Sequence, residues 1–302
     1  MEEINDFFIY LTNEKNYSKN TLKSYKIDVD NFLQFVIDKL NKNIDSKTLI
    51  ELDFKDFSAW LSDRFNSGLT SRSNARALSA VKSMFKFLQK RHNIFNPIVS
   101  KIKTPKIQKT LPRTVSLNNF LKMQECIIPL ISDVWCQKRD KALLTLIYST
   151  GMRISEALSI NNSSFIGKDL IKVYGKGNKE RILPLLSIAK LQLDEYMNLC
   201  PYKNCFDKYL FVGKSGKKYS PTLFQRLLQK IRRLLNLPEN ITPHAFRHSF
   251  ATDLLNAGAS IRIIQALLGH ENLATTQIYT HVTSAKQKEI LKTKHPRNKI
   301  HI

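Results

Sequence analysis

Apolar residues recur at helical spacing through the first third of the chain. After Ser18, an apolar face made of Leu22, Tyr25, Val29, Phe32, Leu33, Val36 and Leu40 lies opposite Lys23, Lys26 and Asp30. This period predicts an amphipathic helix that begins after Ser18. A second apolar set ends at Gly68, and a third contains Leu78, Val81, Phe85 and Leu88. Residues 1–95 are therefore predicted to form a small helical bundle.

Prolines and positive charge replace this pattern between residues 96 and 113. Pro97, Pro105 and Pro112 stand in a segment with no acidic residue. Its lysines are Lys101, Lys103, Lys106 and Lys109. The composition predicts an extended interdomain linker. A plain spacer would need no charge, so we favour a linker that contacts a phosphate backbone.

Two short β runs interrupt the helical pattern of residues 114–302. Leu170–Tyr174 and Ile182–Leu185 flank the glycine-containing segment 175–181, which predicts a hairpin. Helical patterns precede this hairpin and return after Ser220. The sequence therefore predicts a mainly α protein with a small β-sheet, divided into domains 1–95 and 114–302 by the linker 96–113.

The charge of the chain indicates a polyanionic partner. Its 302 residues include 48 Lys and Arg against 25 Asp and Glu, a formal net charge of +23. Solubility alone does not require such an excess, and nucleic acid is the first candidate partner. No apolar run is long enough to span a bilayer, and the acidic start of the chain is unlike a secretory signal. We expect a cytoplasmic protein with no membrane partner.

Basic side chains crowd the last helix of the predicted bundle. They are Arg72, Arg76, Lys82 and Lys86, which we predict to contact DNA phosphates. The alternative is an ordinary solvated face, and the basic charge of the whole chain weighs against it. The four cysteines have neither CxxC spacing nor nearby histidines, so no metal site is expected.

Two arginines and one histidine have contexts that would fix them near an anion. Thr242-Pro243 predicts a helix start that places His244 and Arg247 on one face of the first turns. Arg153 follows Gly151 and precedes an apolar helical register. A guanidinium can hold two phosphate oxygens at once. The alternatives are a surface or capping pair for His244 and Arg247, and an ion pair with Glu156 for Arg153.

Three further residues could complete a phosphoryl-transfer site. Lys176 lies between Gly175 and Gly177, where a lysine can reach a leaving oxygen. His270 follows Gly269 at a predicted helix end, and Tyr279 lies in a polar stretch nine residues later. A tyrosine can take the phosphoryl group as an ester and later return it. Taken singly, a turn lysine is usually solvated and a tyrosine usually packs.

Together these motifs resemble those of the tyrosine recombinase family, and within it the bacterial Xer recombinases. The similarity covers nearly the whole chain. The motifs that carry it are Thr150-Gly-Met-Arg153-Ile-Ser-Glu156-Ala-Leu158, Gly175-Lys-Gly-Asn-Lys-Glu-Arg181, His244-Ala-Phe-Arg247-His-Ser-Phe-Ala-Thr252, Leu267-Leu-Gly-His270 and Thr275-Thr-Gln-Ile-Tyr279. The resemblance implies a four-helix N-terminal core-binding (SAM-like) domain and a mixed α/β catalytic domain that close around DNA.

The resemblance also implies a mechanism. Arg153, Lys176, His244, Arg247, His270 and Tyr279 would be the catalytic residues, with Glu156 in support. Tyr279 would form a 3′-phosphotyrosine without a cofactor or metal. The expected partners are double-stranded DNA with a dif-like site, a tetramer of this chain with itself or with a Xer paralogue, and a septal DNA translocase. Residues 284–294 resemble a helix that Xer subunits exchange.

Other functions remain open at this stage. A type IB topoisomerase uses similar groups, but the N-terminal bundle and the Xer-like C-terminus argue against it. An integrase of a mobile element would share the chemistry, although many phage integrases carry an extra domain before the bundle. A catalytically silent DNA-binding accessory protein would explain the charge but would leave the full set of chemical groups unexplained.

Overall fold

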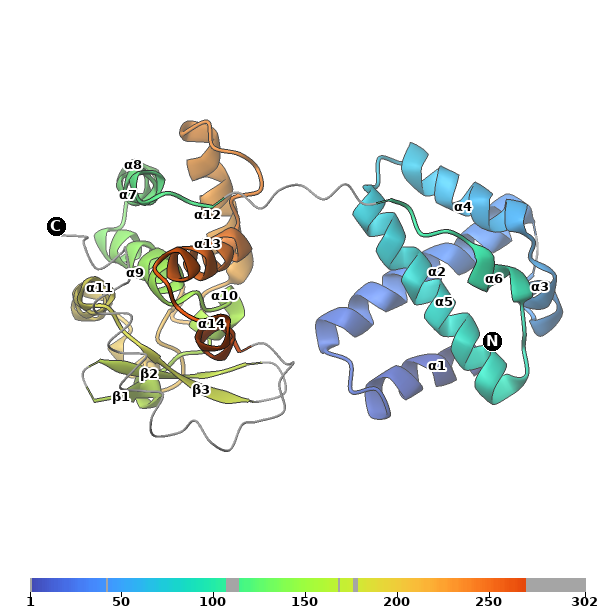
Figure 1. Cartoon of the computed structure of the whole chain (residues 1–302), viewed down its shortest axis with the longest axis horizontal. Helices are drawn as coiled ribbons and strands as arrows, with labels where there is room; N and C mark the ends of the chain where they lie inside the picture. The colour runs from blue at the N-terminus through green and yellow to red at the C-terminus, as the bar shows by residue number, and fades with distance from the viewer. Residues whose placement is uncertain (1, 42, 107–113, 168, 176–178, 270–302) are drawn as a thin grey trace. The chain divides into compact units, whose positions relative to one another are not determined.

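The chain folds into two compact units, Met1–Thr110 and Leu111–Ile302. This computed structural model describes residues 2–41, 43–106, 114–167, 169–175 and 179–269. The predicted mainly helical architecture with a small β-sheet is confirmed (Figure 1). Within the described residues, no helix has both the length and the apolar character needed to cross a membrane.

The first unit is helical throughout its described part. Its helices are α1 (Glu2–Asn13), α2 (Lys19–Leu40), α3 (Ser46–Glu51), α4 (Phe54–Asn66), α5 (Ser71–His92) and α6 (Pro97–Lys101). The predicted helix after Ser18 is α2, and the Ser18 hydroxyl caps it by accepting from the Thr21 N–H at 3.2 Å. The aromatic rings of Phe32 and Phe57 stack in the core between α2 and α4. The helical bundle predicted from the apolar period is confirmed.

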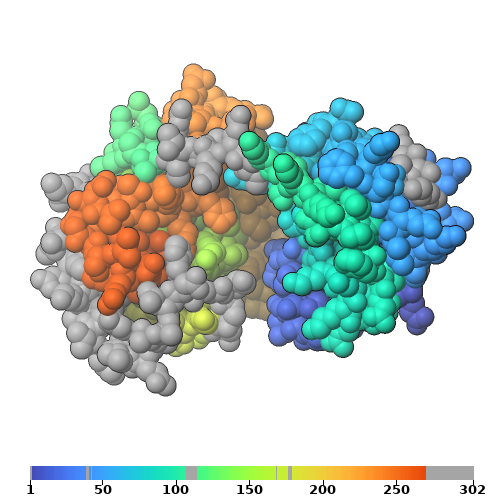
Figure 2. Space-filling view, turned by 45° about the vertical axis from the view of Figure 1, so that its right-hand side comes forward, coloured from blue at the N-terminus to red at the C-terminus, as the bar shows by residue number. Residues whose placement is uncertain are grey.

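The start of the predicted linker needs correction. Residues 96–102 form α6 and its flanks and belong to the core of the first unit, where Val99 and Ile102 are buried. The Asn96 side chain caps α6 and also donates to the Leu49 and Leu52 carbonyls at 2.9 and 2.8 Å. α6 contacts α4 and α5, and in Figure 2 green residues of this unit lie beside blue ones. Proline here starts a helix at its first turn, where it needs no amide donor.

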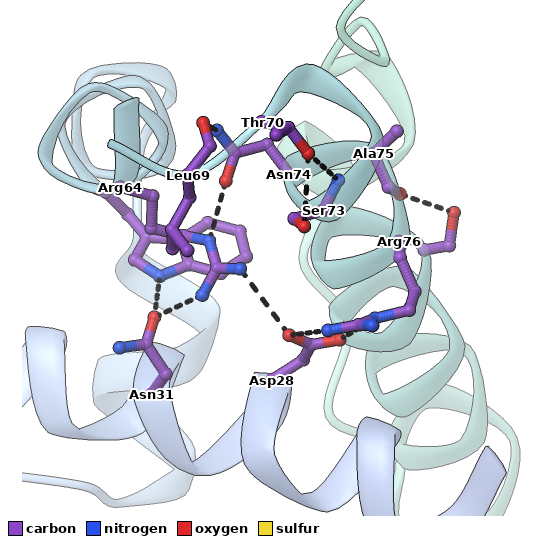
Figure 3. A network of polar contacts seen from close by, with 11 residues as sticks. Asp28, Asn31, Arg64, Leu69, Thr70, Ser73, Asn74, Ala75 and Arg76 are labelled. Carbon is purple, nitrogen blue, oxygen red and sulfur yellow. Dashed lines mark hydrogen bonds and ion pairs between the residues drawn. The ribbon is translucent and has the colours of Figure 1, made fainter. Parts of the chain in front are cut away.

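A buried carboxylate ties three helices of the first unit together (Figure 3). Asp28 in α2 is 1% exposed and accepts from Arg76 of α5 at 2.8 and 3.2 Å. It also pairs with Arg64 of α4 at 3.5 Å. Arg64 is itself buried and donates to Asn31 and Asn74. Because a buried charge is costly without partners, this network fixes the angles at which α2, α4 and α5 pack.

The second unit is built around a helix whose second half is buried on all sides. Its described helices are α7 (Leu117–Glu125), α8 (Ile127–Leu130), α9 (Val134–Thr150), α10 (Ile154–Ala157), α11 (Ser187–Leu199), α12 (Pro221–Leu234), α13 (Pro243–Asn256) and α14 (Ile261–Leu268), with the short 3₁₀ turns η1 (Asn162–Ser164) and η3 (Lys203–Cys205). The residues from Ala142 to Thr150 are buried in an unbroken run. α11, α13 and α10 pack around α9, which makes it the centre of this core.

An antiparallel sheet in the order β1-β2-β3 completes the described part of the second unit. Its strands are β1 (Phe165–Ile166), β2 (Leu170–Tyr174) and β3 (Glu180–Pro184), which confirms the predicted hairpin. Val173 pairs with Arg181, and Ile171 pairs with Leu183. Opposite residues of paired strands point to the same face. The arginine therefore shares its face of the sheet with buried aliphatic side chains.

Replacing Asp28 tests the network of the first unit. Asp28→Asn leaves the Arg64 guanidinium buried without its counter-charge. It also places an amide N–H donor opposite the N–H donors of Arg64 and Arg76. We expect the free energy of unfolding of this unit to fall by about 3–5 kcal/mol. Urea unfolding of the full chain, followed by Trp60 fluorescence in a Trp135→Phe background, measures the change because the chain has two tryptophans.

Glu14→Gln is the matched control in the same unit. Glu14 pairs with Arg91 at 2.9 Å, but both side chains are about half exposed. Exposed pairs contribute about 0–1 kcal/mol, so this variant should unfold close to the unaltered protein. Equal losses for both variants would contradict the role of the buried network.

Candidate functional site

Arg153 lies at the start of α10, directly after the chain leaves α9. α9 ends at Gly151, whose φ of 65° is left-handed, and Arg153 is the N-cap residue of α10. The Glu156 carboxylate accepts from the Arg153 backbone N–H at 2.7 Å and from its guanidinium at 2.8 Å. The ion pair considered from the sequence is therefore present, yet the Arg153 side chain is still 34% exposed. Glu156 fixes Arg153 and leaves part of it accessible.

Arg181 of β3 binds the same carboxylate from the other side. Its Nη2 and Nη1 atoms donate to the Glu156 Oε2 and Oε1 atoms at 2.7 and 3.2 Å. Its Nε donates to the Leu267 carbonyl at 2.9 Å, at the end of α14. The sequence placed Arg181 in the hairpin motif and assigned it no role. The available signal was its register: Arg181 shares a face of β3 with Leu183, where an apolar residue would be ordinary.

Arg247 points into the interior from the first half of α13. The predicted helix start is confirmed, with Pro243 at the first position, although the Thr242 side chain makes no capping bond. The Arg247 guanidinium donates to the Gly151 carbonyl at 2.9 Å and to the Leu268 carbonyl. It thus joins the turn before Arg153 to the end of α14. We call Arg153, Glu156, Arg181 and Arg247 the arginine cluster.

Ionisation in the arginine cluster follows from burial and from neighbouring charge. The pKa of Arg247 is lowered to about 10, mainly by burial and also by the neighbouring charges of Arg153 and Arg181, while Glu156 opposes the shift. Burial alone would raise the pKa of Glu156, but hydrogen bonds from Arg181 and Arg153 outweigh it, and the net shift is downward. Arg247 and Glu156 are therefore ionised at neutral pH, and the cluster holds three guanidinium groups and one carboxylate. Such an excess of positive charge favours binding of an anion.

His244 is exposed in the first turn of α13, three residues before Arg247. Its side chain is exposed, whereas that of Arg247 is buried. Across the described ranges, no hydrogen bond joins His244 to the arginine cluster. Lys176, His270 and Tyr279 lie outside the described residues, as do 284–302, so their predicted roles stay predictions. Their chain neighbours Gly175 and Gly269 are described.

Two of the predicted DNA-contacting residues already have structural partners. Arg76 binds Asp28 and remains 49% exposed (Figure 3), and the Lys82 ammonium donates to the Ile102 carbonyl at 2.7 Å. The other exposed members of the set are Arg72, Lys86, Lys101, Lys103 and Lys106. Lys109 lies outside the described residues. The contact of these side chains with DNA stays a prediction.

Metal ligands are not grouped in the described part of the chain. Among these residues, no set of three or more His, Cys, Asp or Glu side chains could hold a metal ion. The positive charge at the arginine cluster comes from guanidinium groups.

Both units match known protein families. Residues 125–286 match the phage integrase family, and residues 4–92 match the phage integrase N-terminal SAM-like domain. The predicted SAM-like domain is thereby confirmed. The chain is similar to the tyrosine recombinase XerC of Rickettsia canadensis (strain McKiel), with 42% identity over 92% of each chain. Its identity to XerC of Rickettsia prowazekii (strain Madrid E) is 40%, over 95% of this chain and 94% of the relative.

Solved structures with a similar fold are site-specific recombinases. One is the XerH recombinase bound to a palindromic difH substrate after cleavage, with 23% identity, a TM-score of 0.66 and coverage of 92% of this chain and 81% of that one. Another is a lambda integrase tetramer bound to a Holliday junction, with 16% identity, a TM-score of 0.71 and coverage of 92% and 80%. At these identities the similarity supports the fold.

Gly151 provides a test of how the arginine cluster is positioned. A Cβ atom on Gly151 would lie 2.6 Å from the Phe250 ring and 3.1 Å from Leu268, and its φ of 65° is unfavourable for a side chain. We expect Gly151→Ala to destabilise the second unit by about 2–4 kcal/mol, because strain from φ adds to overpacking. Amide hydrogen exchange in α9 and α13 of the full chain measures the loss.

Gly258→Ala separates the two contributions. Gly258 has a φ of 81° at the end of α13, and a Cβ atom there would meet open space. This control should cost only the backbone strain, about 1 kcal/mol. A loss at Gly151 no larger than the loss at Gly258 would contradict the close packing of Gly151 against Phe250.

Proposed function

The chain belongs to the phage integrase family of tyrosine recombinases, and from this we propose that it cuts and rejoins DNA at a specific site through a 3′-phosphotyrosine at Tyr279. The observation that carries the proposal is the arginine cluster. Arg153 and Arg247 are 94 residues apart in the chain, yet they act on each other electrostatically beside one carboxylate. Two guanidinium groups with excess positive charge suit the non-bridging oxygens of a scissile phosphate.

In the proposed reaction, the Tyr279 oxygen attacks the phosphorus atom and the bond to the 5′ oxygen breaks. His244 takes the phenolic proton, and Lys176 donates a proton to the leaving 5′ oxygen. Arg153, Arg247 and His270 hold the charge that develops on the phosphate. The 5′ hydroxyl of the partner duplex then attacks the phosphotyrosine and releases Tyr279. Each ester is replaced by another, so the exchange itself consumes no nucleotide cofactor.

The proposed biological role is resolution of chromosome dimers at a dif-like site during chromosome segregation in the cytoplasm. XerC is the name of the relatives that are about 40% identical over most of this chain, and their likeness supports a Xer role. We propose that the active species is a tetramer on double-stranded DNA, formed by this chain alone or with a Xer paralogue, and that a septal DNA translocase activates it. The net charge of +23 supports binding to DNA.

The integrase of a mobile element uses the same chemistry, and the choice of DNA site distinguishes it. Such an enzyme would recombine attachment sites of the element and would leave a dif-like site intact. A silent accessory protein would bind DNA and form no adduct. A type IB topoisomerase would relax supercoils without bringing two sites together. These outcomes can be told apart with purified protein.

A nicked suicide substrate tests the nucleophile. The nick lets a short 5′-hydroxyl fragment diffuse away, so that wild-type protein should accumulate a covalent 3′ adduct on a dif-like duplex. Tyr279→Phe lacks the attacking oxygen, and we expect it to bind the duplex with unchanged affinity and to trap none. Denaturing gels measure the adduct, and mobility shift measures binding.

Tyr209→Phe is the matched control. It removes a hydroxyl from a half-buried tyrosine in the same unit and should form the adduct at the wild-type rate. If Tyr279→Phe forms the adduct, the proposed nucleophile is rejected. If wild-type protein forms none, the proposed reaction is rejected.

Removal of residues 284–302 tests the proposed subunit exchange. We expect the shortened chain to bind a dif-like duplex but to lose ordered strand exchange, because the contact between neighbouring subunits would be lost. Recombination of a two-site plasmid is the measurement. Comparing the purified chain alone with the chain plus a Xer paralogue also shows which of the two proposed tetramers is active. Unchanged recombination by the shortened chain would refute this part of the proposal.

A further inference from the structure

Arg181 makes more contacts with the site than any role in a β-hairpin requires. It uses two nitrogens for the Glu156 carboxylate and a third for the Leu267 carbonyl. Its side chain is 10% exposed. The guanidinium thus connects three elements that are distant in the chain: β3, α10 and the end of α14. A planar group with five donors can make such a junction, and an ammonium cannot match its geometry.

Two glycines leave room for this junction. A Cβ atom on Gly175 would lie 3.3 Å from the Arg181 Nη1 atom and 3.6 Å from the Glu156 Oε1 atom. A Cβ atom on Gly269 would lie 3.3 to 3.6 Å from the Arg181 guanidinium and Cδ. The backbone on both sides of Arg181 therefore approaches closely, and the side chain is enclosed rather than folded onto the surface.

Glu156 reaches Arg153 in one direction and Arg181 in the other. The carboxylate is 4% exposed, so it needs its bonds to remain ionised in place. Arg153 contributes one backbone bond and one guanidinium bond, and Arg181 contributes two guanidinium bonds. Removing Arg181 would leave the carboxylate buried with about half of its donors. Its ionised form, and its hold on Arg153, would weaken.

We propose that Arg181 is a positioning residue for strand cleavage, which acts through Glu156 to hold Arg153 in its phosphate-binding orientation. The inference rests on the function proposed above. Arg181 itself need not touch DNA, because its guanidinium already faces Glu156 and the Leu267 carbonyl. Its contribution is to the orientation of Arg153, and it is separate from protonation of the leaving group.

Single-turnover cleavage of the suicide duplex at saturating protein tests this inference. Arg181→Met keeps the length of the side chain and removes its donors. We expect cleavage to slow by about 100-fold, the effect of misplacing a group by about 1 Å, with DNA affinity within about threefold of wild type. Arg181→Lys restores the charge without the planar fork, and it should cleave faster than Arg181→Met and slower than wild type.

Combination with Glu156→Gln shows whether Arg181 acts through the carboxylate. If it does, the double variant Arg181→Met/Glu156→Gln should be no slower than the slower single variant, because both changes disrupt one interaction. Losses that multiply would mean independent roles and would overturn the inference. Arg262→Met, at an exposed position of α14, is the matched control and should cleave at the wild-type rate.

The pH profile supplies a readout that a general loss of stability would not produce. Arg153, Arg181 and Arg247 are the charged groups that act on Glu156 or are coupled to it. Arg181 supplies a hydrogen bond and a charge that lower the pKa of Glu156, so we expect that pKa to rise when Arg181 is removed. The cleavage rate of Arg181→Met should then fall as the pH decreases through that raised pKa, whereas the rate of wild type should not fall in this pH range. The fall should disappear when Glu156→Gln is added to Arg181→Met.

A duplex with sulfur in place of the 5′ bridging oxygen completes the test. A thiolate leaves without a proton, so this substrate removes the need for a general acid. Because Arg181 acts on the orientation of Arg153, Arg181→Met should still cleave the sulfur substrate more slowly than wild type does. Full restoration would place the defect in leaving-group protonation and overturn the inference.

Failure of this inference can be distinguished from failure of the proposed function. If wild type forms the adduct and Arg181→Met forms it equally fast, the positioning role alone is rejected. Wild type that forms no adduct rejects both. If Arg181→Met does not fold by circular dichroism, the outcome is decided by Arg181→Lys: a wild-type rate and pH profile for that variant would overturn the inference.

Discussion

The Glu156 carboxylate holds together guanidinium groups that reach it from different parts of the fold. Arg153 approaches from the start of α10 and Arg181 from β3. Arg247 lies close enough that Arg153 and Arg181 lower its pKa, while Glu156 raises it. Without the carboxylate these cations would repel each other in a partly buried space, where electrostatic interactions are stronger than in water. One buried negative charge therefore permits a concentrated positive site to exist within a stable core.

The first unit uses the same device. Asp28 is buried, pairs with the buried Arg64 and with the half-exposed Arg76, and so holds one guanidinium inside while the other remains accessible. Glu156 does the same with the buried Arg181 and the partly exposed Arg153. In a chain with a formal charge of +23, each unit has an arginine whose orientation is fixed in advance. Such preorganisation lowers the entropy cost of holding a phosphate.

Backbone carbonyls at helix ends complete this arrangement. Arg247 donates to the carbonyl of Gly151 at the end of α9 and to that of Leu268 at the end of α14, and Arg181 donates to Leu267. Carbonyls in the last turn of a helix have no partner within the helix, and they carry partial negative charge. The two arginines satisfy them and gain fixed orientations. A Cβ atom on Gly151 would lie 3.1 Å from the Leu268 side chain, so the ends of α9 and α14 lie close together.

The sequence by itself determined most of the helices and strands, because helical period, strand alternation and capping residues are local properties. It predicted α2 from its apolar face and the hairpin from two β runs, and it offered the pairing of Arg153 with Glu156 as an alternative from their spacing of three. It could not place residues 96–102, because a proline after a cap reads equally as a helix start or as a linker until the Asn96 bonds to the α3 end are seen. It also could not assign Arg181, whose partners Glu156 and Leu267 are 25 and 86 residues away. Only the tertiary structure decided these contacts, since convergence of distant side chains depends on how the helices pack around α9.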